Sequence, residues 1–127
     1  MPFKLEREKT ATTPYILIDE EKEYVRFLGR CYLEDILGFF KEINEWLGEY
    51  LSSSPAKLTF DCELEYFNSS TTKLLYNMLR VMDKAAAGGV DVTVNWIAAE
   101  DNNMVIECGE DLSDEMKHLK FNLIAGK

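Results

Sequence analysis

Histidine and cysteine are scarce in this chain of 127 residues. The one histidine, His118, cannot build a multi-histidine metal site, and we expect neither a metal nor a cofactor. The three cysteines, Cys31, Cys62 and Cys108, are odd in number, widely spaced and form no CxxC pair. This pattern indicates neither a disulfide framework nor a structural zinc site. We interpret the cysteines as small buried residues and His118 as a surface residue.

Long apolar runs and an excess of basic residues are also absent. No apolar run reaches the roughly 18 residues that a membrane-spanning helix needs, and Met1 to Lys9 contains no secretory signal. Asp and Glu outnumber Lys and Arg by 23 to 14, which gives a net charge of −9. An acidic chain is poorly suited to bind the nucleic-acid backbone or an anionic membrane. We therefore expect a cytoplasmic globular protein that binds neither.

The apolar pattern predicts five strands and three helices in an order typical of α/β proteins. The first 13 residues are polar and lead to Pro14, so we expect residues 1–13 to form a loose N-terminal arm. The predicted strands cover residues 15–18, 24–28, 57–67, 90–96 and 121–124. The predicted helices cover residues 33–50 and 74–87, with a short helical stretch beginning at 104.

Strands joined through helices imply parallel neighbours with right-handed crossovers. For this length we predict a mixed sheet of four or five strands, with the helices packed mainly on one face. The sequence contains no repeat, linker or low-complexity tract. We therefore assign residues 1–127 to a single α/β domain.

The strand predicted over 57–67 has the clearest alternation. Its apolar side carries Leu58, Phe60, Cys62, Leu64 and Tyr66, and its polar side carries Thr59, Asp61, Glu63 and Glu65. Three carboxylates on one face raise the alternative of metal or acid–base chemistry. Alternate residues of a strand lie roughly 7 Å apart, and no other ligand type accompanies them. We favour a solvated face.

The segment Asn68-Ser69-Ser70-Thr71-Thr72 joins this strand to the second helix. Asn and Ser are preferred helix N-caps, so the segment can serve as a cap alone. A helix N-terminus also offers unpaired N–H groups and the positive end of the helix dipole, which suit a phosphate. A phosphorylated hydroxyl is the functional alternative at this turn.

Residues around this turn resemble a known phosphoacceptor. Leu64-Glu65-Tyr66-Phe67-Asn68-Ser69-Ser70, followed by an apolar helix, is similar to the turn of anti-sigma-factor antagonists and other STAS domains. The closer resemblance is to the SiaC-type family of STAS-like bacterial phosphoproteins. Four stretches carry it: Thr13 to Ile16, Leu64 to Lys73, Gly88-Gly89 to Val94-Asn95-Trp96, and Phe121 to Ile124.

The resemblance implies a STAS-like fold and a non-enzymatic signalling role. In this family a Ser/Thr kinase phosphorylates the turn, a PP2C-type phosphatase reverses the reaction, and the unphosphorylated form binds and regulates a diguanylate cyclase. The family acceptor follows the turn Asn directly, which maps it to Ser69, with Ser70 as the fallback. Asn68, where other STAS domains often have Asp, would cap the helix and orient the acceptor.

The partner surface is expected at the turn and along the second helix, where Lys73, Asn77 and Arg80 lie three to four residues apart. A solvated helix face is the alternative for these three.

Two other functions are possible for this sequence: an enzyme that uses Cys62 or Cys108, and an unphosphorylated STAS-like scaffold that binds a small ligand. The residues that would line a ligand pocket, but that also fit a core, are Trp46, Met78, Met82 and Trp96. Exposed strand edges would allow a homodimer.

Overall fold

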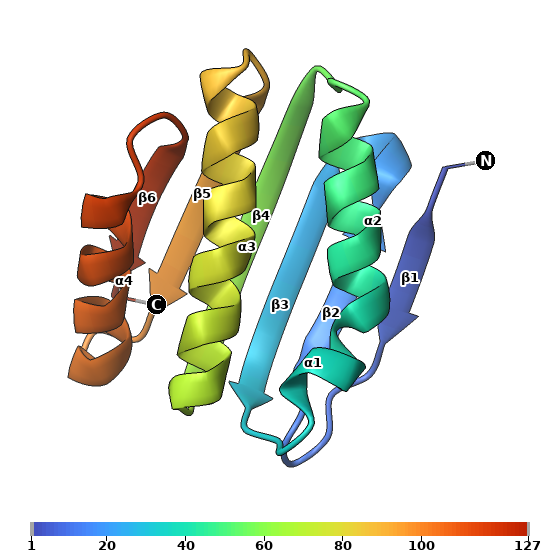
Figure 1. Cartoon of the computed structure of the whole chain (residues 1–127). Coiled ribbons are helices and arrows are strands. Elements are labelled where there is room, and N and C mark those ends of the chain that lie inside the picture. The colour runs from blue at the N-terminus through green and yellow to red at the C-terminus, as the bar shows by residue number, and fades with distance from the viewer. Residues whose placement is uncertain (1, 127) are drawn as a thin grey trace.

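Six strands form one mixed sheet whose spatial order follows the chain, β1-β2-β3-β4-β5-β6. We describe residues 2–126 from a computed structural model (Figure 1); Met1 and Lys127, the ends of the expected domain, lie outside the described residues. Strands β1 to β3 pair antiparallel, and β3 to β6 pair parallel. Their bounds are β1 Lys4–Arg7, β2 Tyr15–Asp19, β3 Tyr24–Cys31, β4 Lys57–Phe67, β5 Asp91–Ala98 and β6 Lys120–Ala125.

All four α-helices cover the same face of the sheet (Figure 1). Each connection between parallel strands crosses that face, so the α/β class, the mixed sheet and the one-sided helix layer are confirmed. The helices are α1 Ile36–Phe39, α2 Lys41–Ser52, α3 Ser69–Ala87 and α4 Asn103–Glu115, with a 3-10 turn η1 at Glu20–Lys22. No helix within residues 2–126 combines the length and the apolarity needed to cross a bilayer.

The expected loose arm over residues 1–13 is wrong, because its residues Lys4–Arg7 form β1. The sheet therefore has six strands instead of four or five. Tertiary contacts hold this charged segment in place: Phe3 stacks on Trp46 with ring centroids 5.7 Å apart. Arg7 donates to the Phe39 carbonyl at 3.0 Å and pairs with Glu42 at 3.1 Å.

The helix predicted over 33–50 is divided in two. Asp35 caps α1 by accepting from the Gly38 N–H at 3.0 Å, and α2 begins after Phe40. Phe40 is buried at this junction. The apolar period continues through both helices, which is why the sequence pattern did not reveal the break.

Tyr66 departs from the predicted alternation of the strand over 57–67. It is 41% exposed, whereas Phe67 is buried. The pairing of β3 with β4 shifts at Gly29 and Arg30, so that Gly29 lies opposite Leu64 but Arg30 lies opposite Tyr66. The shift turns the end of β4 by one residue and places Phe67 in the core.

The cysteines are only partly buried as expected, since Cys31 and Cys62 are buried but Cys108 is half-buried.

The acidic side of β4 lies on the face of the sheet that the helices leave uncovered. Asp61 accepts hydrogen bonds from the Tyr24 hydroxyl at 2.6 Å and from Asn95 at 2.8 Å, and Asn95 accepts from Asn122 at 3.0 Å. Burial, together with the bond to Asp61, raises the pKa of Tyr24 to about 12. Within residues 2–126, no group of three or more His, Cys, Asp or Glu side chains could hold a metal ion.

Asp83 of α3 fastens the turn that leads into β6. Its Oδ1 accepts the backbone N–H groups of Lys117, His118 and Leu119 at 3.1, 2.7 and 3.0 Å. Partial burial acts to raise the pKa of Asp83, but the three N–H donors outweigh it and hold the pKa below its ordinary value. The charged carboxylate thus stabilises the folded state.

Replacing Asp83 by Asn is expected to destabilise the protein by about 1–2 kcal/mol at neutral pH, because hydrogen bonds to a charged acceptor are lost. Since folding lowers the pKa of Asp83, its contribution is fully present above pH about 4 and is lost as the pH falls through the lowered pKa. Urea denaturation across this pH range measures the difference. Asp114→Asn removes an exposed carboxylate of α4 and serves as the control. A pH-independent deficit in Asp83→Asn would contradict the ionic origin.

Candidate functional site

The turn between β4 and α3 is built around Asn68. Its backbone is extended, and its Oδ1 accepts the N–H of Thr71 at 3.1 Å, which caps α3. The same oxygen accepts the hydroxyl of Ser70 at 3.0 Å. The structure therefore places Asn68 as the cap that the sequence predicted. Its carbonyl oxygen also accepts the Thr72 N–H at 3.1 Å, the first bond of the helix.

Thr71 anchors the turn to the neighbouring strand. Its hydroxyl donates to the Cys31 carbonyl at the end of β3, at 2.9 Å, and lies 3.0 Å from Asn68 Oδ1. Thr71 is 1% exposed. The buried Thr71 hydroxyl is therefore inaccessible to a kinase, which needs an exposed acceptor oxygen.

Ser69 and Ser70 are both exposed. Ser69 is the first residue of α3, where backbone N–H groups lack partners within the helix. The Ser70 hydroxyl is engaged with Asn68, as described above, whereas Ser69 lies at the mouth of a surface groove between α3 and α4. Of these two exposed serines, Ser69 is the one that lines the groove.

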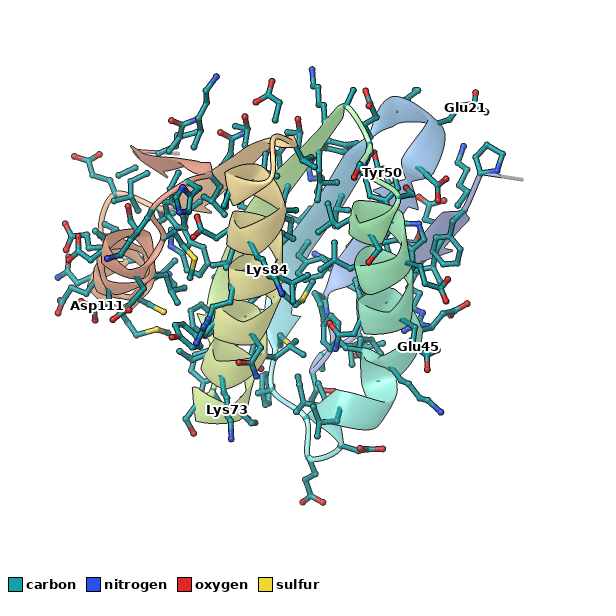
Figure 2. All side chains as sticks on the ribbon, turned by 45° about the horizontal axis from the view of Figure 1, so that its top comes forward. Glu21, Glu45, Tyr50, Lys73, Lys84 and Asp111 are labelled. Atoms are coloured by element: carbon teal, nitrogen blue, oxygen red, sulfur yellow. The ribbon has the colours of Figure 1, made fainter. Side chains whose placement is uncertain are left out.

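The groove between α3 and α4 carries charges of both signs. Near Ser69 it is lined by Lys73 and Tyr76 of α3 and by Asp111 and Glu115 of α4. It continues along α3 past Arg80, whose guanidinium lies 5.7 Å from the Tyr76 ring centroid. Figure 2 shows Lys73 and Lys84 along α3, with Asp111 on the neighbouring α4. An added phosphate would enter a groove that is lined by one lysine and two carboxylates of its own chain.

The three expected partner-binding residues do not share one groove. Lys73 and Arg80 line the α3/α4 groove with Ser69, whereas Asn77 lines a second groove between α2 and α3, beside Leu37 and Val81. All three are exposed. Sequence reasoning missed Asp111 and Glu115. The acidic run of α4 was the available signal, but the sequence does not show that it packs beside the turn.

The thiols are poorly suited to nucleophilic catalysis. Burial raises the pKa of Cys62 and of Cys31, and burial together with the nearby Asp111 raises the pKa of Cys108. A raised pKa leaves little reactive thiolate at neutral pH. The four residues weighed as a ligand pocket all belong to the buried core: Trp46, Met78, Met82 and Trp96. Neither alternative function gains support from this geometry.

Comparison with known proteins decides the family. The sequence profile described as SiaC family regulatory phosphoprotein matches residues 7–126. The chain belongs to the SiaC family. The expected family is thereby confirmed, and with it the role of a regulatory phosphoprotein instead of an enzyme.

SiaC of Pseudomonas aeruginosa has the same fold, with a TM-score of 0.88 and 24% identity over 97% of this chain and 98% of that one. The diguanylate cyclase SiaD has been solved in complex with its activator SiaC from the same organism. That structure matches at 25% identity and a TM-score of 0.88, covering 95% of this chain and 98% of the other. An uncharacterised protein of P. aeruginosa strain UCBPP-PA14 is 26% identical over 106 residues, 84% of each chain.

Proposed function

We propose that this SiaC-family protein is a cytoplasmic activator of a diguanylate cyclase and that phosphorylation of Ser69 switches it off. The observation that carries the proposal is the likeness to SiaC, the activator in the complex with SiaD, over nearly the whole chain. By binding the cyclase, the unphosphorylated chain would control synthesis of cyclic di-GMP. Lys73 and Arg80, beside Ser69, and Asn77 in the adjacent groove are the proposed contacts.

The chain acts as the substrate of the phosphorylation step. A Ser/Thr kinase brings ATP and its metal ion, and the Ser69 oxygen attacks the γ-phosphorus as ADP leaves. The seryl proton passes to a base of the kinase. A PP2C-type phosphatase restores the hydroxyl by hydrolysis. The N-terminus of α3 can accommodate the resulting dianion, because the helix dipole and free N–H groups favour negative charge.

The groove explains how one phosphate would alter partner binding. At Ser69 the phosphate adds nearly two negative charges at neutral pH. It enters the groove that Lys73, Asp111 and Glu115 also line. A partner surface that docks here would have to remove water from the phosphate in a groove that also carries carboxylates. This desolvation costs free energy only in the bound state, so it weakens binding.

Incubation with ATP and a cognate Ser/Thr kinase is expected to add one phosphate to Ser69. Intact mass and peptide mapping measure the product. Ser69→Ala should abolish the modification, whereas the matched variant Ser70→Ala should keep it, because Asn68 still caps α3 through the Thr71 N–H. Phosphate on Ser70 would keep the function and move the site. If a kinase active on another substrate adds none, the proposed switch is wrong.

A further inference from the structure

Strand β6 ends the sheet with an open edge. It pairs with β5 on one side, and its other side has no strand partner among residues 2–126. Two of its apolar side chains are exposed, Leu123 at 44% and Ile124 at 37%. Such an edge presents unpaired N–H and C=O groups together with apolar surface, which is a template for another strand.

The opposite edge of the sheet is protected. β1 has only four residues, three of them charged, and Arg7 ties it to α1 and α2 through Phe39 and Glu42. β6 has six residues and a single charge, on Lys120 at its start. Because proteins blunt open edges by shortening, charging or covering them, the unprotected β6 edge indicates a surface that is covered by a partner.

Helix α4 supplies a strong negative charge along this edge. It packs on the end of the sheet (Figure 1), and its Gly109 lies against Leu123 of β6. Its 13 residues include five acids, Glu107, Glu110, Asp111, Asp114 and Glu115, and no Lys or Arg. Asp111 and Glu115 line the groove toward α3. The helical period places Glu110 on the other side of α4, and both Glu110 and Asp114 are exposed.

The negative charge of α4 indicates which kind of strand can pair with the β6 edge. If a second copy paired its β6 with this one about a two-fold axis, both acidic α4 helices would flank the junction and repel each other. A basic strand would meet the acids with complementary charge. We propose that the β6 edge of this protein binds an extended, basic segment of a partner protein as a seventh strand.

The two faces of the added strand would contact different surfaces of this protein. On the helix side, lysine or arginine stems would pack along Leu123 while their charged ends extend toward Glu110. On the open side, apolar residues would lie next to Ile124, which pairs with Ile97 of β5. Backbone hydrogen bonds would provide affinity, and the alternation of basic and apolar residues would provide specificity.

The test uses the full chain and a defined peptide, acetyl-Lys-Val-Lys-Val-Lys-Val-amide. Hydrogen exchange is expected to slow across residues 120–125 when the peptide binds, since the edge amides acquire partners. The same peptide with every internal amide N-methylated keeps its charge and side chains but cannot pair. Its affinity should fall by about tenfold or more, because main-chain bonds carry strand addition. Equal binding of the methylated peptide would show simple charge attraction and overturn the proposal.

Two charge-reversal variants locate the site. Glu110→Lys should weaken the peptide by about tenfold, because it replaces an attraction by a repulsion. Glu45→Lys makes the same change on α2, at the other side of the molecule from Asp111 in Figure 2, and should change the affinity far less. Equal loss in both variants, or no protection of residues 120–125, would refute the proposal. Protection of β6 that rises with protein concentration without peptide would assign the edge to a second copy instead.

Discussion

Phosphorylation of Ser69 is expected to weaken binding to the cognate diguanylate cyclase about a hundredfold, which corresponds to about 2.7 kcal/mol. The physical reason is the position of the phosphate. It stands at the exposed start of α3, in the groove that Lys73, Asp111 and Glu115 also line. A bound partner must remove water from the dianion without providing it a full set of positive charges.

Titration of the cyclase with the unmodified and the fully phosphorylated chain measures this difference, and cyclase activity gives a second readout. Ser69→Ala should bind as tightly as the unmodified chain and remain active after kinase treatment. Ser69→Asp should fall between the two states, since one carboxylate carries less charge than the phosphate. Equal affinities for the two phosphorylation states would refute the switch and leave binding to the cyclase untouched.

Replacing Gly109 by Ala is expected to lower the free energy of unfolding by about 1–3 kcal/mol, the range found for overpacked cores. A methyl group at Gly109 would overlap the indole ring of Trp96 and the side chain of Leu123. Trp96 is 1% exposed, and its Nε1–H donates to the Val105 carbonyl of α4 at 2.8 Å. The ring therefore cannot move aside without breaking a buried hydrogen bond.

Gly48 provides the matched control for this substitution. It also lies inside a helix, α2, but a methyl group there would meet nothing within 4 Å. Gly48→Ala should therefore stabilise the protein by up to about 1 kcal/mol, the intrinsic preference of a helix for Ala over Gly. Urea denaturation of both variants gives the comparison through the transition midpoint at constant slope. Destabilisation by both variants would show that the Trp96 contact is not the cause.

The partner surface illustrates why sequence reasoning reached only part of the site. The spacing of Lys73, Asn77 and Arg80 correctly predicted three exposed residues on one helix. It did not predict that α4 and α2 flank α3 on its two sides, which divides the three residues between two grooves. Helical spacing gives the direction of a side chain from its own axis, whereas a groove depends on which element packs next to it.

The sequence by itself determined the α/β class, the order of five strands and the capped turn at Asn68. These features depend on residues that are close in the chain, through the periods of strand and helix and the hydrogen bonding of a short side chain. Tertiary structure alone decided that Lys4–Arg7 joins the sheet, that Phe67 replaces Tyr66 in the core, and that Asp111 faces the Ser69 groove. Each of these depends on a contact between segments distant in sequence, which local patterns do not encode.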